Sequence, residues 1–208
     1  MTRRQWANEH RLPCLGTGST HPPTYAITPH GSMDPDHSSD GVEILLANRQ
    51  SAHPVDEDRL VAAARCVLQD SPFGSASVSL AVVDDSTIHE LNRRYLDHDW
   101  PTDVLSFVLD QHDDRLEGEV IVSADTAAAA AGEFGWSAAD ELLLYTIHGM
   151  LHLVGYDDKS DDDVREMRAA EQRYLRQLGV DSPRAAPTGA GGPGIDAGHR
   201  DEGGNSAP

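Results

Sequence analysis

Residues 142–158 read LLLYTIHGMLHLVGYDD, and this stretch decides how the rest of the sequence is interpreted. Apolar side chains run almost without interruption through its first part, which is typical of a helix buried in a domain core. Ser137, with Asp140 three residues later, suits the amino-terminal cap of that helix. Gly155 permits a left-handed turn that ends it. The sequence therefore predicts a helix over 138–154, followed by a sharp bend.

Two histidines stand four residues apart on this helix, at His148 and His152. Residues at that spacing project from one face, so both imidazoles can reach the same metal ion. The bend can return Asp158, six residues further on, as a third ligand. Its neighbour Asp157 could take that place instead, since spacing alone does not decide between two adjacent carboxylates.

Two imidazoles and one carboxylate suit Zn²⁺ and leave a fourth position for water, whose pKa zinc lowers to about 7. The simpler alternative is a pair of core histidines. However, two unpartnered rings on so apolar a helix would each cost a few kcal/mol. The sequence therefore predicts one zinc ion per chain, bound by His148, His152 and Asp158.

Around this helix, the central part of the chain reads as strands that come early and helices that come late. Strands are expected at 42–47, 76–83, 103–109 and 118–123. Helices are expected at 56–68, through Ile88, Leu91, Asn92 and Tyr95, and at 125–134, 138–154 and 161–178. This order predicts a single α+β domain, with one small mixed sheet and about five helices.

The two ends differ in composition from this centre. Residues 1–40 and 181–208 are rich in small and polar residues and show no apolar period, so we expect disordered extensions on either side of a domain at 41–180. The formal net charge is -19, and residues 41–180 contain 11 Lys and Arg against 27 Asp and Glu. Such acidity argues against a broad nucleic-acid-binding surface, although a bound cation can dominate its own pocket.

Cellular location is constrained by two further features. The only cysteines, Cys14 and Cys66, cannot form a disulfide framework, which favours a reducing cytoplasmic setting. No apolar run approaches the roughly 20 residues of a membrane span, so no membrane partner is expected.

The spacing HxxxHxxGxxD overlaps with that of zinc metallopeptidases. Those enzymes carry a glutamate directly after the first histidine, where it acts as general base. This chain has Gly149 at that position, so a zinc metallopeptidase is only an alternative function.

Three motifs in order resemble the YbeY family of bacterial zinc-dependent endoribonucleases: LNRRYLDHDWPTDVLSF at 91–107, GEVIV at 118–122 and HGMLHLVGYD at 148–157. The resemblance implies cleavage of single-stranded RNA, late 3′-end maturation of small-subunit (16S) rRNA, and ribosome quality control. It also implies the small ribosomal subunit as a partner, and DNA is not expected as a substrate. A third interpretation is a ribosome assembly factor whose metal is structural.

The chain departs from the family pattern at two positions. The family usually has a third histidine where this chain has Asp158, which is still a competent zinc ligand. It also commonly has an arginine where this chain has Leu96. Arg93 or Arg94 could replace that arginine, or both could be ordinary surface charges.

The general base is not identified by the sequence. Ser106 and Asp103, on the strand at 103–109, are candidates for contacting substrate, although both could serve only the local fold. Glu141 lies two helical turns before His148 and could orient a ligand histidine. The favoured interpretation of Glu141 is instead contact with solvent near the start of the helix.

Overall fold

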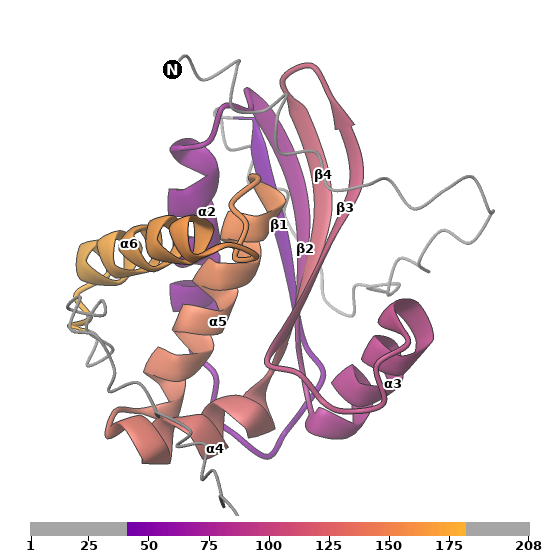
Figure 1. The fold of residues 1–208 in the computed structure, drawn as a ribbon, viewed down its shortest axis with the longest axis vertical. Helices are drawn as coiled ribbons and strands as arrows, with labels where there is room; N and C mark the ends of the chain where they lie inside the picture. The colour runs from indigo at the N-terminus through magenta and orange to yellow at the C-terminus, as the bar shows by residue number, and fades with distance from the viewer. Residues whose placement is uncertain (1–40, 182–208) are drawn as a thin grey trace, which may run out of the picture.

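The computed structural model describes residues 41–181 as one four-stranded sheet with helices on both faces (Figure 1). The strands are β1 (Val42–Asn48), β2 (Ser75–Val83), β3 (Val104–His112) and β4 (Arg115–Ser123). The helices are α2 (Glu57–Gln69), α3 (Asp85–Leu96), α4 (Ala124–Phe134), α5 (Ala138–Leu153) and α6 (Asp161–Gln177). The extensions predicted at 1–40 and 181–208 lie outside the described residues, apart from Asp181.

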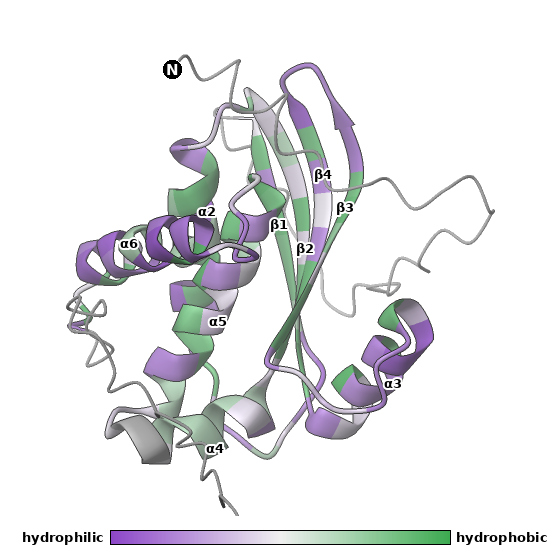
Figure 2. Ribbon diagram, in the orientation of Figure 1, coloured by the Kyte–Doolittle hydropathy of each residue, from purple (hydrophilic) through white to green (hydrophobic). Residues whose placement is uncertain are grey.

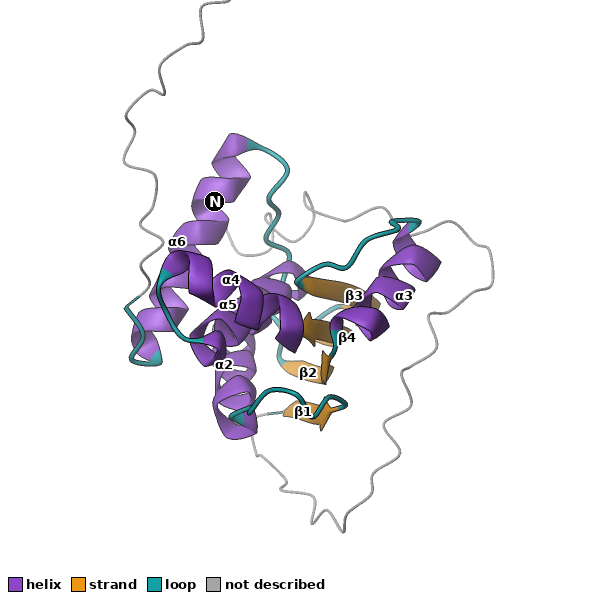
Figure 3. Cartoon of the chain, turned by 90° about the horizontal axis from the view of Figure 1, so that it is seen from below, coloured by secondary structure: helices purple, strands orange, loops and turns teal. Residues whose placement is uncertain are grey.

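The sheet is mixed, with strand order β1-β2-β4-β3. β1, β2 and β4 are parallel to one another, and β3 pairs antiparallel with β4 at the edge. Seen from below, α2, α5 and α6 lie on one side of the sheet, whereas α3 lies on the other (Figure 3). The predicted α+β class, with a small mixed sheet and five helices in the described part, is confirmed.

Each helix starts at a side chain that accepts a hydrogen bond from the backbone N–H three residues later. Such caps satisfy amide groups that have no partner within the helix. Ser137 performs this role for α5, as predicted, by accepting from the N–H of Asp140 at 3.1 Å. The capping residues of the other four helices are Asp56, Asp84, Ser123 and Ser160.

The hairpin of β3 and β4 is longer than predicted. Its strands continue through polar residues to His112 and Arg115, which pair with each other. Main-chain pairing does not depend on apolar side chains, and an irregularity between Val108 and Asp110 breaks the alternation on which the prediction relied. Asp113 adopts a positive φ of 48° in the tight connection between the two strands.

Helix α5 is the centre of the main core, as its apolar colouring in Figure 2 indicates. Eleven of its residues are buried, including Leu143, Ile147 and Leu151 at 0 % exposure. Burying each such side chain contributes about 1.5–3 kcal/mol. None of the described helices combines the length and apolarity that crossing a membrane requires.

Two glycines allow α5 to approach the sheet closely. A Cβ atom at Gly149 would lie 2.6 Å from Val120 Cγ1 and 2.8 Å from Val104 Cγ2. On the sheet side, a Cβ atom at Gly118 would lie 2.9 Å from Leu153 Cδ1. Real Cβ atoms do not approach neighbours this closely, so glycine at these positions sets the distance between α5 and the β3–β4 pair.

Alanine substitution at Gly149 is expected to destabilise the protein. Gly149→Ala should lower the free energy of unfolding by about 1–3 kcal/mol, because the added methyl group forces α5 away from Val120 and Val104. Gly132→Ala is the matched control: Gly132 lies within α4 with no atom near its Cβ position, so alanine should raise stability by up to about 1 kcal/mol. Urea denaturation measures the free energy of unfolding of both variants. The packing argument is contradicted if Gly149→Ala and Gly132→Ala change that free energy by the same amount.

An ion pair ties the start of α5 to α2. Arg59 Nη2 donates to Asp140 Oδ1 at 2.7 Å, and both side chains are largely shielded from solvent. Burial alone would raise the pKa of Asp140, but hydrogen bonds from Ser137 and the charge of Arg59 outweigh it and hold the pKa below its usual 3.8. A carboxyl group of this kind stabilises the fold above its unfolded-state pKa and loses that contribution as the pH falls through its folded-state value.

Asp140→Asn should therefore reduce stability in a pH-dependent way. At neutral pH we expect the free energy of unfolding to fall by about 0.5–1 kcal/mol. The gap between wild type and Asp140→Asn should narrow below pH 3.8 as the wild-type carboxyl becomes protonated. Denaturation curves over this pH range test the expectation, which fails if the gap stays constant in acid.

Candidate metal centre

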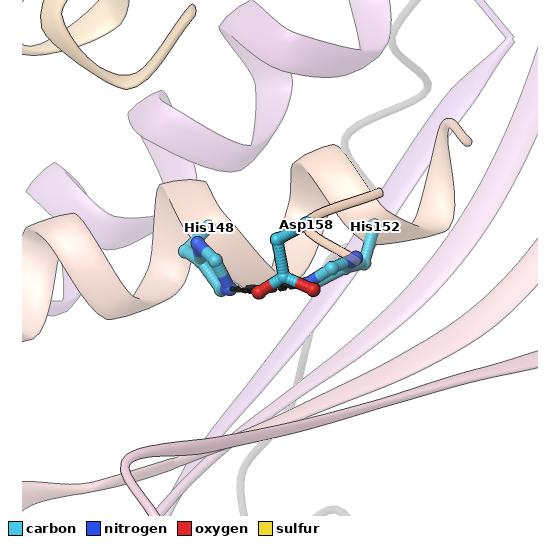
Figure 4. Close-up of side chains that lie close together, drawn as sticks. All are labelled: His148, His152 and Asp158. Carbon is cyan, nitrogen blue, oxygen red and sulfur yellow. Dashed lines mark hydrogen bonds and ion pairs between the residues drawn. The ribbon is translucent and has the colours of Figure 1, made fainter. Parts of the chain in front are cut away.

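The three predicted ligands converge beside α5 (Figure 4). His148 and His152 emerge one helical turn apart, and their Nε2 atoms are 3.0 Å from each other. Gly155, with a φ of 95°, ends the helical segment and turns the chain back. Asp158 then places Oδ2 3.8 Å from His148 Nε2 and 3.9 Å from His152 Nε2.

The dimensions of this cluster fit a zinc ion. The three donor atoms form a triangle with sides of 3.0, 3.8 and 3.9 Å, whose centre lies about 2.1 Å from each corner. Zn–N and Zn–O bonds are about 2.0–2.2 Å long. The two imidazole planes lie at 84° to each other, so their lone pairs approach the centre from different directions. Two nitrogens and one carboxylate oxygen are also a donor set that zinc accepts.

The other nitrogen of each ring has its own partner. His148 Nδ1 is 2.7 Å from Glu171 Oε1 of α6, and His152 Nδ1 is 3.0 Å from the carbonyl oxygen of Tyr156. Because a carboxylate and a carbonyl can only accept, each Nδ1 carries the proton and donates it. Both Nε2 atoms are then left as acceptors that face the centre of the cluster, which is the tautomer that a metal ligand needs.

The electrostatic surroundings of the two histidines differ. Burial lowers the pKa of His148, but the hydrogen bond and negative charge of Glu171, with smaller effects from Asp103 and Asp158, raise it overall. The pKa of His152 is lowered, first by burial and then by the neighbouring His148. Two rings this close therefore disfavour carrying two positive charges at once, whereas a metal ion between the neutral rings would accept a lone pair from each Nε2 atom.

Asp157 and Asp158, which spacing could not separate, have different surroundings. The Asp157 carboxylate is 2.9 Å from Lys159 Nζ and also accepts from the backbone N–H of Asp158. Burial raises the pKa of Asp157, but these contacts outweigh it and lower the pKa overall. Asp158 instead directs Oδ2 towards both histidines, and 47 % of its side chain is exposed. The geometry favours Asp158 as the third ligand.

Two of the residues proposed to contact substrate lie next to this cluster. Ser106 donates its hydroxyl to the carbonyl oxygen of Gly149 at 3.1 Å, between the two histidines in sequence. Asp103 accepts from the backbone N–H of Val104 at 2.9 Å and from the Thr102 hydroxyl at 3.0 Å. Each therefore has a local structural role, and a catalytic role for either residue remains a prediction.

Glu141 does not contact solvent, so the favoured interpretation of this residue was wrong. Its side chain is fully buried at 0 % exposure, and Trp136 Nε1 donates to Oε2 at 2.5 Å. Solvent contact was predicted because the first turn of a helix is usually exposed, whereas Trp136 covers the start of α5 in this fold. The ligand histidines take their partners from Glu171 and Tyr156 instead.

Glu171 was missed by the sequence analysis, although a weak signal for it exists. It lies four residues after Met167 and three before Tyr174, both of which are buried. A carboxylate in register with the apolar face of a helix is costly unless it has a partner. That register indicates a buried polar contact, but it does not reveal that the partner is His148, 23 residues earlier.

Comparison with known proteins decides the family. The family model described as Endoribonuclease YbeY matches residues 45–179, which contain the whole sheet apart from the first residues of β1, all five helices and the metal cluster. The chain belongs to the YbeY family. Members of this family are hydrolytic nucleases, and this chain is an enzyme of that class.

Individual YbeY relatives align over most of their own length. Endoribonuclease YbeY of Moorella thermoacetica is 39% identical over 155 residues, covering 67% of this chain and 99% of the relative. That of Carboxydothermus hydrogenoformans is 41% identical over 139 residues, covering 65% and 97%. A solution structure from Thermotoga maritima is 28% identical, with a TM-score of 0.48, and the match covers 66% of this chain and 88% of that one. Family membership rests on the sequence matches.

Loss of the Glu171 carboxylate should weaken metal binding. Glu171→Gln keeps the size of the side chain but removes the negative charge that holds the His148 Nδ1 proton, so zinc affinity should fall about 10- to 100-fold. Competition with a chromogenic chelator measures that affinity. Glu166→Gln, at an exposed position of α6, is the matched control and should bind zinc as wild type does. Equal affinity in both variants would contradict the positioning role.

Proposed function

We propose that this protein is a single-strand-specific, zinc-dependent endoribonuclease that acts late in 3′-end maturation of 16S rRNA and in ribosome quality control. The observation that carries the proposal is a three-ligand cluster, open on one side, in a chain of the YbeY family. The proposed ligands are His148, His152 and Asp158, with one zinc ion per chain.

Zinc is favoured over other metals by the donor set and by its size. Magnesium and calcium prefer all-oxygen surroundings, whereas two imidazoles suit zinc. When bound, zinc supplies Lewis-acid chemistry: it lowers the pKa of water towards 7 and stabilises negative charge on phosphoryl oxygens.

The protein groups around the cluster hold the ligands in place. Glu171 and the Tyr156 carbonyl hold the Nδ1 protons of the two histidines, so neither ring must rotate to face the centre of the cluster. Ser106 secures the backbone between them through Gly149. Such preorganisation matters in hydrolysis because small displacements of catalytic groups are costly to the rate. Asp103, whose charge acts on His148, is a candidate for handling a proton of the substrate.

Two other functions fit the structure less well. A metallopeptidase needs a carboxylate directly after the first histidine, and Gly149 has no room for any side chain at that position. A structural metal in an assembly factor would favour a closed site with four protein ligands. Among the described residues the cluster has three ligands, and the exposed Asp158 leaves it open to solvent.

We further propose rRNA within the small ribosomal subunit as the substrate, in the cytoplasm, with neither DNA nor membrane as partner. The relatives are named endoribonucleases, which supports RNA as the class of substrate. Leu96, at the position where the family commonly has an arginine, is 44 % exposed and cannot contact phosphate by charge.

Removal of one ligand should abolish the activity. His152→Ala should lose stoichiometric zinc and lower cleavage of single-stranded RNA at least about 100-fold, because the remaining two ligands cannot hold the metal. Metal content by atomic emission and a gel assay on labelled single-stranded RNA measure both effects. Casein serves as the peptidase substrate and should remain intact with wild type. His112→Ala, which changes an exposed histidine in the hairpin, is the matched control.

One result would overturn the proposal, and another would change its third ligand. RNA cleavage that is unchanged in His152→Ala would remove the metal from the reaction. Zinc content that survives Asp158→Ala but is lost in Asp157→Ala would show that the third ligand is Asp157.

A further inference from the structure

The large hydrophobic side chains that are exposed in the described part of the chain lie close together in sequence. They are Leu96 at 44 %, Trp100 at 57 % and Val108 at 40 % exposure. Leu96 is the last residue of α3 and Trp100 lies in the connection from α3 to β3, shortly after the two arginines in the last turn of α3. An exposed tryptophan leaves a large apolar ring in water, so Trp100 is a candidate for contact with a ligand.

Trp100 forms an aromatic pair with His98. The ring centroids are 4.7 Å apart and the planes are inclined by only 13°, so the two rings stack face to face. Since one face of the indole lies against His98, the high exposure of Trp100 places its other face in solvent.

The backbone around this pair is held firmly by α3. Asn92 is 2 % exposed, and its side-chain amide donates to the carbonyl oxygen of Trp100 at 2.8 Å. The carbonyl oxygen of Asn92 accepts from the N–H groups of Asp97 and His98. His89 Nε2 is 3.0 Å from Asp99 Oδ1, and Pro101 restricts the backbone of Trp100 to extended conformations. The aromatic pair is therefore preorganised and exposed at once.

Basic groups lie beside the pair. Arg93 and Arg94 are exposed in the last turn of α3, and neither forms a salt bridge with any residue that the structure describes. Most other cations of the domain do have such a partner, for example Arg59 with Asp140. The Arg94 guanidinium lies 5.6 Å from the centre of the Tyr95 ring. In a chain with a net charge of -19, two adjacent exposed arginines without a carboxylate partner among the described residues form a small positive patch that suits an anionic ligand.

The pair also lies close to the metal centre along the chain. Trp100 is three residues before Asp103, a separation of at most about 11 Å in extended chain. The charge of Asp103 acts on His148, and Val104 packs against Gly149. The chain thus connects Trp100 over a short distance to Asp103, whose charge reaches the metal centre.

We propose that the His98–Trp100 pair is a stacking site for an unpaired RNA base, with Arg93 and Arg94 contacting the adjoining phosphates. The proposal rests on the endoribonuclease function proposed above and specifies how that site selects its substrate. Aromatic rings accept any base by stacking, whereas a base inside a duplex has no free face. The pair thus provides a physical basis for preferring single strands without reading their sequence.

The test measures binding and tryptophan fluorescence with the zinc-loaded full-length chain. The probe is a short single-stranded RNA with phosphorothioate linkages, which resist hydrolysis, and a second probe lacks its bases. Trp100→Ala should weaken binding of the first probe about 5- to 100-fold. Trp100→Phe should retain most of the affinity, because it keeps an aromatic face. His98→Ala should act in the same direction more weakly, and His112→Ala is its exposed control.

The second probe separates stacking from electrostatic contact. The baseless probe should bind wild type and Trp100→Ala equally, and only the probe with bases should quench the fluorescence of Trp100. The stacking site would be overturned if wild type and Trp100→Ala bound the probe with bases equally well. It would also be overturned if Trp100→Ala weakened binding of both probes by the same factor. If wild type cleaves single-stranded RNA in a zinc-dependent way, such a result leaves the proposed function intact. If wild type neither binds nor cleaves RNA, both proposals fall.

Discussion

The contact of α5 with β3 and β4 at Gly149 is the constraint on which the rest of the structure depends. With no side chain between helix and strands, the backbone of α5 lies against Val120 and Val104, and Ser106 can bond directly to the carbonyl oxygen of Gly149. His148 and His152, on either side of this contact, are thereby held at a fixed height above the sheet. This packing holds the two histidine ligands in place, because ligands on a well-packed helix are placed more accurately than ligands on loops.

The elements and the ligand pair were predictable because their signals are local. Helical spacing relates His148 to His152, and Ser137 marks the start of α5 by accepting from the N–H of Asp140, three residues later. The partners of these residues were not predictable from one sequence. Glu171 reaches His148 from another helix, and Trp136 covers Glu141 from the turn that precedes α5. Tertiary contacts of this kind depend on how elements pack, which periodicity does not encode.

The acidity of the chain has a structural explanation that reconciles it with an RNA substrate. Many of its carboxylates lie at helix starts, where they accept hydrogen bonds from free amide groups or interact with the helix dipole. The negative charge of these carboxylates is thus spread over several helices, and the helix amide groups and dipoles partly offset it. Net charge alone is a poor guide to a substrate when exposed basic groups are concentrated at one place, as Arg93 and Arg94 are at the end of α3.

The bond between Glu171 and His148 has a thermodynamic consequence for the whole domain. It connects α6, the last element of the fold, to the ligand that begins the metal cluster. Binding free energies that act through a shared contact are reciprocal: if docked α6 tightens the hold on the metal, the metal must tighten the docking of α6 by the same amount. A metal bound through His148 would therefore stabilise the packing of α6 by as much as α6 stabilises the bound metal.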